Sequence, residues 1–111
     1  MDEIEELTDV FKALSDPTRL KLVRLLSVKE DTSCSDKVHK GEISLCVNAL
    51  AHNLGVSQSA VSQHLRVLRQ VGLVKSERRG NSVHYMLDRD SLRQHTSRFQ
   101  KTMGDDFVIV K

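Results

Sequence analysis

Cys34, His39 and Cys46 carry the side chains of this sequence that best fit a metal ion. Thiolate and imidazole are ligands for zinc and for softer transition metals, so the three residues form a candidate site for such an ion. Their spacing matches no established ligand motif, and two alternatives stay open. Cys46 could be a small, half-buried apolar side chain, or Cys34 and Cys46 could form a redox-active thiol pair.

A different chemistry is indicated by the stretch VSQSAVSQHLRVLRQVGLV, residues 56–74. No Asp or Glu occurs between Glu42 and Glu77, although the chain has 15 acidic residues. Hydroxyl and amide groups hydrogen-bond to base edges, guanidinium groups bind phosphates, and a carboxylate facing a duplex would be repelled. The stretch therefore predicts a helix that faces nucleic acid, and the alternative is an ordinary solvated polar face.

Side-chain type and position divide the expected contacts to double-stranded DNA. Short and amide side chains at the start of the helix should reach base edges, and the arginines that follow should reach the backbone. The predicted base contacts are Gln58, Ser59, Ser62 and Gln63. The predicted backbone contacts are Arg66, Arg69, Arg78 and Arg79, and His64 and Asn81 complete the DNA-binding set.

Charge is distributed unevenly along the chain. Residues 1–42 carry 7 basic and 10 acidic side chains, whereas residues 43–87 carry 5 basic and 1 acidic. Residues 88–111 carry 5 basic and 4 acidic side chains. The net charge of +2 is too small to indicate a partner by itself, but the middle segment would tolerate a polyanion.

Composition excludes several classes of protein. Two cysteines do not make a disulfide framework, the acidic N-terminus does not resemble a signal peptide, and no apolar run approaches the ~18 residues of a membrane span. We therefore expect a cytoplasmic protein with no membrane partner. Because no nucleophile–His–acid arrangement, phosphate loop or HExxH motif is present, an enzyme is not expected.

Hydrophobic spacing and capping residues place the elements. Apolar residues at helical spacing predict a first helix over 3–14, and Asp16-Pro17 predicts the start of a second. In this second helix we expect five residues to be largely buried: Leu20, Leu22, Val23, Leu25 and Leu26. The aperiodic, charged residues 28–43 predict a loop. The other expected elements are a short helix from about Val47 to Gly55, a helix from the Ser57 cap to Gly72, two strands around residues 79–82, and a last helix over about 90–103.

These elements predict a mainly α fold with a β-hairpin, a winged helix-turn-helix with about five helices and two strands. Residues 1–104 should form one such domain, and residues 105–111 a C-terminal tail. The helix of residues 57–71 would enter the major groove, and the basic hairpin would be the wing. A winged-helix module that docks on a protein instead of DNA is the alternative, because the first third of the chain is acidic.

LSDPTRLKLVRLL and SLCVNALAHNLGVSQSAVSQHLRVLRQVGLVKSERRGNSVHYML resemble the ArsR/SmtB winged-helix repressors, and the resemblance covers roughly residues 4–100. It implies a homodimer that binds an imperfectly palindromic operator and releases the DNA when an inducer, often a metal ion, binds. It also implies that the first and last helices pair across the dimer. The expected interface residues are Ile4, Leu7, Phe11, Leu92, His95 and Phe99.

The sequence departs from both metal-binding patterns that are frequent in that family. Where the family has a Cys-x-Cys motif, this chain reads SLCVNAL, so Cys46 is present and Asn48 replaces the second cysteine. The last helix has Asp88, Asp90 and His95 but lacks the later His-x-x-Glu or His-x-x-His pair. A thiol-responsive or otherwise non-metal repressor of the same fold therefore stays open.

Overall fold

The computed structural model describes residues 2–27, 38–39, 42–43 and 45–104. The first two helices begin at acidic caps. α1 (Glu3–Leu14) follows Asp2, and α2 (Pro17–Ser27) follows Asp16, and each carboxylate accepts hydrogen bonds from backbone N–H groups of its helix's first turn. These N–H groups have no partner within a helix, so an acidic cap stabilises both starts. Both predicted helices are confirmed.

The next two helices form a helix-turn-helix. α3 (Val47–Leu54) ends at Gly55, whose left-handed backbone (φ 68°) directs its N–H to the carbonyl of the last turn. α4 (Gln58–Gln70) begins after Ser57, whose hydroxyl accepts a hydrogen bond from the third backbone N–H of the new helix at 3.1 Å. The predicted turn and cap are both confirmed.

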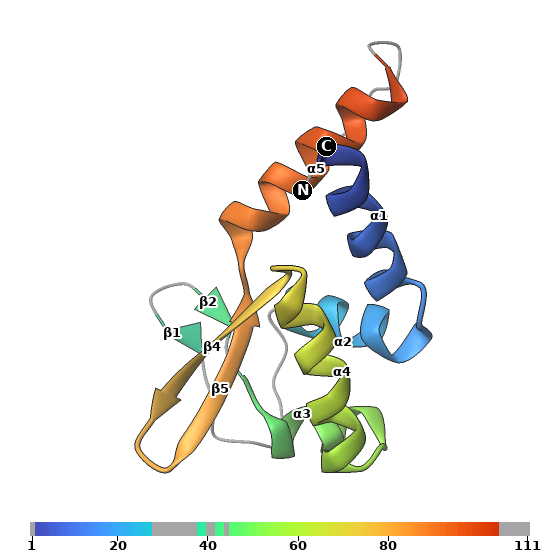
Figure 1. Ribbon diagram of the computed structural model, residues 1–111. Helices are drawn as coiled ribbons and strands as arrows, with labels where there is room; N and C mark the ends of the chain where they lie inside the picture. The colour runs from blue at the N-terminus through green and yellow to red at the C-terminus, as the bar shows by residue number, and fades with distance from the viewer. Residues whose placement is uncertain (1, 28–37, 40–41, 44, 105–111) are drawn as a thin grey trace.

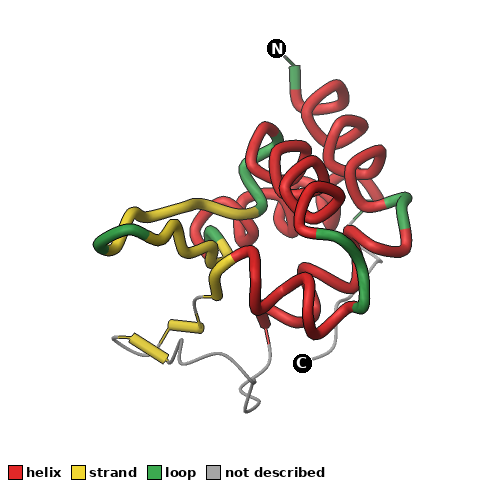
Figure 2. The backbone as a smooth tube through the Cα atoms, turned by 90° about the horizontal axis from the view of Figure 1, so that it is seen from below, coloured by secondary structure: helices red, strands yellow, loops and turns green. Residues whose placement is uncertain are grey.

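A β-hairpin follows α4. β4 (Val74–Arg79) pairs with β5 (Ser82–Leu87) in antiparallel register, and Gly80 (φ 61°) supplies the positive backbone angle that a two-residue hairpin turn needs. The short strand β3 (Leu45–Cys46) adds to the other edge of β5, giving the order β3-β5-β4. Figure 2 shows the hairpin projecting away from the helices.

α5 (Arg89–Met103) is capped by the Asp88 carboxylate, which accepts a hydrogen bond from Ser91 N at 3.1 Å. This helix starts one residue before its predicted start. In Figure 1, α1 and α5 lie at one end of the molecule, and α3 and the hairpin tip lie at the other. The helix-turn-helix and the hairpin are thus separated from the face that α1 and α5 form.

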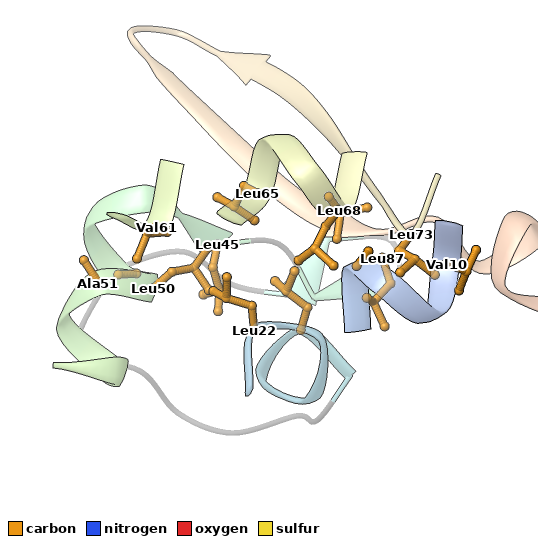
Figure 3. Packing of buried hydrophobic residues seen from close by; sticks show 14 residues of the cluster. Val10, Leu22, Leu45, Leu50, Ala51, Val61, Leu65, Leu68, Leu73 and Leu87 are labelled. Atoms are coloured by element: carbon orange, nitrogen blue, oxygen red, sulfur yellow. The ribbon is translucent and has the colours of Figure 1, made fainter. Parts of the chain in front are cut away.

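One apolar core joins the elements. Leucines dominate it, and Figure 3 shows side chains from α2, α3, α4 and the sheet pointing toward one another. Val61, Leu65 and Leu68 lie on one face of α4 and are fully buried. Because this face is fixed in the core, the opposite face of α4 must point outward.

The structure corrects the predicted elements in two respects. The described residues form three strands besides the two of the hairpin: β3, and a two-stranded ribbon of β1 (Val38–His39) and β2 (Glu42–Ile43) within the predicted loop. These segments are only two residues long, too short for an alternating pattern to reveal them. Leu20, predicted to be buried, is 51% exposed because it lies on the outer face of α2.

Within the described part of the chain, none of the helices has the length and apolar character that a membrane crossing requires. The predicted tail, residues 105–111, lies outside the described residues.

Candidate nucleic-acid interface

The exposed face of α4 carries polar and basic side chains without an acid. Gln58, Ser59, Ser62, Gln63, Arg66 and Arg69 are all exposed on this helix. The structure therefore brings together on one surface the α4 residues that the sequence analysis grouped. A helix of this kind is compatible with the major groove, which is about 12 Å wide.

The first residue of α4 is tied to α3. The amide Nε2 of Gln58 donates a hydrogen bond to Oδ1 of Asn48 at 3.1 Å, and both side chains are exposed. Asn48 is the second residue of α3 and was not among the predicted site residues. This contact could not be predicted from the sequence, because the two residues are ten positions apart and meet only through the turn.

His64 of α4, also predicted to face DNA, lies half-buried against Arg19 of α2. Nη1 of Arg19 lies 3.2 Å from Nδ1 of His64. Because a guanidinium has only donors, Nδ1 must accept, and a neutral His64 then carries its proton on Nε2. Arg19 therefore fixes the tautomer of His64 and leaves Nε2–H as a donor.

Arg19 is itself held by the chain around it. Its Nε donates to the carbonyl of Ala13 at 2.5 Å, which connects α2 to the end of α1. The pKa of the Asp16 carboxyl is lowered, chiefly by the hydrogen bond from the backbone N–H of Arg19 and also by the Thr18 N–H and the Arg19 charge, while desolvation opposes the shift. Arg19 thus connects the end of α1 to His64 of α4.

The two arginines of the wing, Arg78 and Arg79, differ in whether a described residue pairs with them. Arg79 forms an ion pair with Glu77 at 3.3 Å, and Arg69 of α4 donates to the Ser76 hydroxyl at 3.3 Å, connecting the last turn of α4 to β4. Arg78 is exposed, and neither it nor Arg66 has a hydrogen-bond or ion-pair partner among the described residues. Asn81 is exposed in the hairpin turn.

His95 connects α5 to the end of α4. Its Nε2 lies 3.0 Å from the carbonyl oxygen of Val71 and 3.3 Å from the Ser91 hydroxyl, and its Nδ1 lies 3.3 Å from Nη1 of Arg98. Because Arg98 can only donate, Nδ1 accepts and Nε2–H donates to Val71. Both ring nitrogens of His95 are therefore engaged in hydrogen bonds within the protomer.

The predicted metal residues are only partly visible. Cys34 lies outside the described residues, and only the backbone of His39 is described, where it pairs with Glu42. Cys46 is half-buried, as expected for a small apolar side chain, and is paired in register with His84 of β5. In the described part of the chain, no three His, Cys, Asp or Glu side chains are grouped closely enough to hold a metal ion.

The predicted interface residues lie on α1 and α5, which pack against each other. Phe11 and Phe99 meet edge to face with ring centroids 5.6 Å apart, and Arg98 forms an ion pair with Glu6 at 3.3 Å. Leu7 is 5% exposed and so is buried within a single protomer. Ile4 and Phe11 remain 58% and 47% exposed.

The helix-turn-helix, its acid-free outer face and the adjacent basic hairpin define a winged helix-turn-helix protein. Residues 40–76 match the family model described as "Bacterial regulatory protein, arsR family". The "Transcriptional repressor SmtB homolog" of Synechocystis sp. is 39% identical over 87 residues, which is 78% of this chain and 55% of that protein. The "Uncharacterized HTH-type transcriptional regulator YbzH" of Bacillus subtilis is 32% identical over 88 residues, which is 78% of this chain and 88% of that protein.

A solved structure, the "ArsR-like Transcriptional Regulator from Rhodococcus sp. RHA1", superimposes with a TM-score of 0.69 at 28% identity, covering 91% of this chain and 81% of that one. The chain belongs to the ArsR family, whose members are transcriptional regulators and not enzymes. The predicted family and fold class are therefore confirmed. The match spans little more than half of the Synechocystis protein but most of the Bacillus one.

Proposed function

We propose that this protein is a homodimeric repressor that binds a specific, imperfectly palindromic DNA operator. The observation that carries the proposal is the outward face of α4, where amides, hydroxyls and an unpaired guanidinium lie together without a carboxylate. Gln58, Ser59, Ser62 and Gln63 would contact base edges in the major groove. This assignment follows from their exposure and their position in the first half of the helix.

The arginines would contact the phosphate backbone. Arg66 and Arg78 are the leading candidates, because no described residue competes for their guanidinium groups. Arg69 and Arg79 have partners within the protomer and would act from fixed positions. The Nε2–H of His64 and the amide of Asn81 complete the proposed surface.

The homodimer would form through α1 and α5. Large apolar side chains on this face, Ile4, Phe11 and Met103, are 58%, 47% and 56% exposed in a single protomer. A second copy would remove them from water, which stabilises association at about 25 cal/mol for each Å² of apolar surface buried. The half-buried residues Leu92, His95 and Phe99 would lie beneath these exposed side chains at the interface, and Leu7 would belong to the protomer interior.

An inducer would act by changing the geometry between the dimer face and α4. The His95–Val71 hydrogen bond links α5 directly to the end of α4, so a displacement of α5 would be transmitted there. A soft metal ion at Cys34, His39 and Cys46 and oxidation of the two thiols are the two classes of inducer that the sequence favours. Either would act at Cys46, the residue immediately before α3.

The test is a titration of labelled duplex DNA from upstream of the protein's own gene, followed by fluorescence anisotropy. Arg66→Glu combined with Arg78→Glu should abolish binding, because it places two negative charges per protomer on the proposed surface. Arg93→Glu combined with Lys101→Glu makes the same charge change on α5. Light scattering checks that this control variant is still a dimer, and the dimeric control should bind DNA as the wild-type protein does. Full binding by the first double variant would contradict the proposed interface.

The same titration identifies the inducer. It is repeated with reduced and oxidised protein and with zinc, cadmium, copper(I), nickel or arsenite. Weakening of about 10-fold, equivalent to about 1.4 kcal/mol of coupling, identifies a responsive protein, and Cys46→Ser or His95→Ala then locates the site. Equal binding under all conditions would mean that these metals and oxidation are not the signal.

A further inference from the structure

Asn48 lies at the outer surface of the helix-turn-helix, in contact with the first residue of α4. It is exposed at the second residue of α3, and its Oδ1 accepts the 3.1 Å hydrogen bond from Nε2 of Gln58, the first residue of α4. Neither residue takes part in the core. The contact therefore fixes a side chain at the outer surface of the helix-turn-helix and adds little to the packing of α3 on α4.

The hydrogen bond restricts Gln58 without consuming its recognition groups. A glutamine amide has two N–H donors and one oxygen that can accept twice, and Asn48 takes one donor. One N–H and the oxygen remain, which is the pair of groups that binds N7 and N6 of adenine in the major groove. Guanine offers two acceptors at the corresponding edge and would leave the glutamine oxygen without a donor.

We propose that Asn48 is a positioning residue for base readout: it holds the Gln58 amide so that its remaining donor and acceptor recognise one adenine in each half-site. The inference rests on the proposed DNA-binding function and adds to it a residue and a base. The Nδ2 of Asn48 has no partner among the described residues, and it would donate to a phosphate beside that adenine. Without Asn48, Gln58 would have to lose side-chain freedom on binding.

The expected effect follows from that freedom. Ordering one rotamer-rich side chain at an interface weakens binding by about threefold to tenfold, so Asn48→Ala should reduce discrimination by about that factor per half-site. Asn53→Ala is the matched control, because Asn53 lies on the same helix, is exposed and, among the described residues, its side chain bonds only to the Ala49 carbonyl of its own helix. Asn48→Asp keeps the Oδ1 acceptor but adds a charge that phosphate repels.

The experiment uses the full chain and a duplex selected by the wild-type protein from a random library. Each A·T pair of a half-site is replaced in turn, and adenine is also replaced by 7-deazaadenine, which removes N7. Gln58→Ala should lose discrimination at one adenine, and Asn48→Ala should reduce it at that same adenine only. In the Gln58→Ala background, Asn48→Ala should change nothing further at that position, and Asn48→Asp should keep the discrimination while losing affinity for every sequence.

Failure of the proposed DNA-binding function and failure of the Asn48 role give different results. If the wild-type protein selects no sequence from the library, the proposed function fails. If it selects one and Asn48→Ala weakens all duplexes equally, or leaves discrimination at the Gln58 adenine unchanged, the function stands and this inference is overturned. A loss caused by unfolding is recognised by circular dichroism and by comparison with Asn53→Ala.

Discussion

Gly72 is the residue at which the α4–β4 turn meets α5, and replacing it with alanine tests that contact. Gly72 has φ 77°, and a Cβ built on it would lie 2.8 Å from the Ser91 hydroxyl oxygen. Gly80 in the hairpin has φ 61°, but a Cβ there would meet nothing within 4 Å. The two glycines therefore share the left-handed backbone and differ in the contact with α5.

The cost of each substitution can be worked out from these geometries. An alanine in the left-handed region costs about 1–2 kcal/mol at either position. At Gly72 the Ser91 hydroxyl must also rotate away, which breaks its 3.3 Å contact with His95 and costs about 1 kcal/mol more. We expect Gly72→Ala to destabilise the protein by about 2–3 kcal/mol and Gly80→Ala by about 1–2 kcal/mol.

Urea unfolding at one fixed protein concentration measures both values, because the stability of a dimer depends on concentration. The decisive comparison is Gly72→Ala in a Ser91→Ala background, where the nearest remaining atom of residue 91 is its Cβ at 3.9 Å. There the cost of Gly72→Ala should fall to that of Gly80→Ala. Equal costs for the two glycines in the wild-type background, or no rescue by Ser91→Ala, would refute the proposed steric origin.

The remaining predictions concern the DNA-facing surface, the core and the α2 cap. Arg66→Gln should reduce the magnitude of the slope of log affinity against log salt by about 1.8, because each of two protomers loses one phosphate contact worth about 0.9. Lys101→Gln should leave the slope unchanged. Anisotropy across a salt series measures both slopes, and a reduction of only ~0.9 would contradict a symmetric dimer on DNA. Leu65→Ala should cost about 3–5 kcal/mol in urea unfolding, since Leu65 is 0% exposed, while Leu20→Ala should have almost no effect, since Leu20 is 51% exposed; similar losses would mean that the core is wrongly placed. Because the pKa of Asp16 is lowered, its carboxylate stabilises the fold above the unfolded-state pKa and loses this effect as pH falls through the folded-state pKa. The Tm values of the wild-type protein and Asp16→Asn should therefore converge as pH drops below about 4. Tm curves that stay parallel would contradict a stabilising role for the Asp16 carboxylate.

Much of the fold could be predicted from local signals. The apolar face of α4, its Ser57 cap and the Gly55 turn are properties of neighbouring residues, so spacing alone placed this helix and its outward face. The hairpin followed from two runs around Gly80 for the same reason. The strands β1, β2 and β3 could not be predicted, because a two-residue segment becomes a strand only through its partner.

The same distinction applies to the site. Side-chain type and the absence of acids determined which residues form the candidate DNA surface. Only the tertiary structure decided their states: that Arg79 is paired with Glu77 while Arg78 is not, and that Leu7 is buried within the protomer. The pairing of Arg79 depends on side-chain positions within β4, and the burial of Leu7 depends on how α1 packs against the other helices.

The supporting residues were decided by tertiary structure alone. Asn48 against Gln58, Arg19 against His64 and His95 against the Val71 carbonyl each join elements that no sequence period relates. By itself, the sequence determined the helices, their polar faces and the family, because those depend on spacing along the chain. How α4 is held from α2, α3 and α5 was decided by folding, because hydrogen bonds between distant residues form only where packing brings their atoms within about 3 Å.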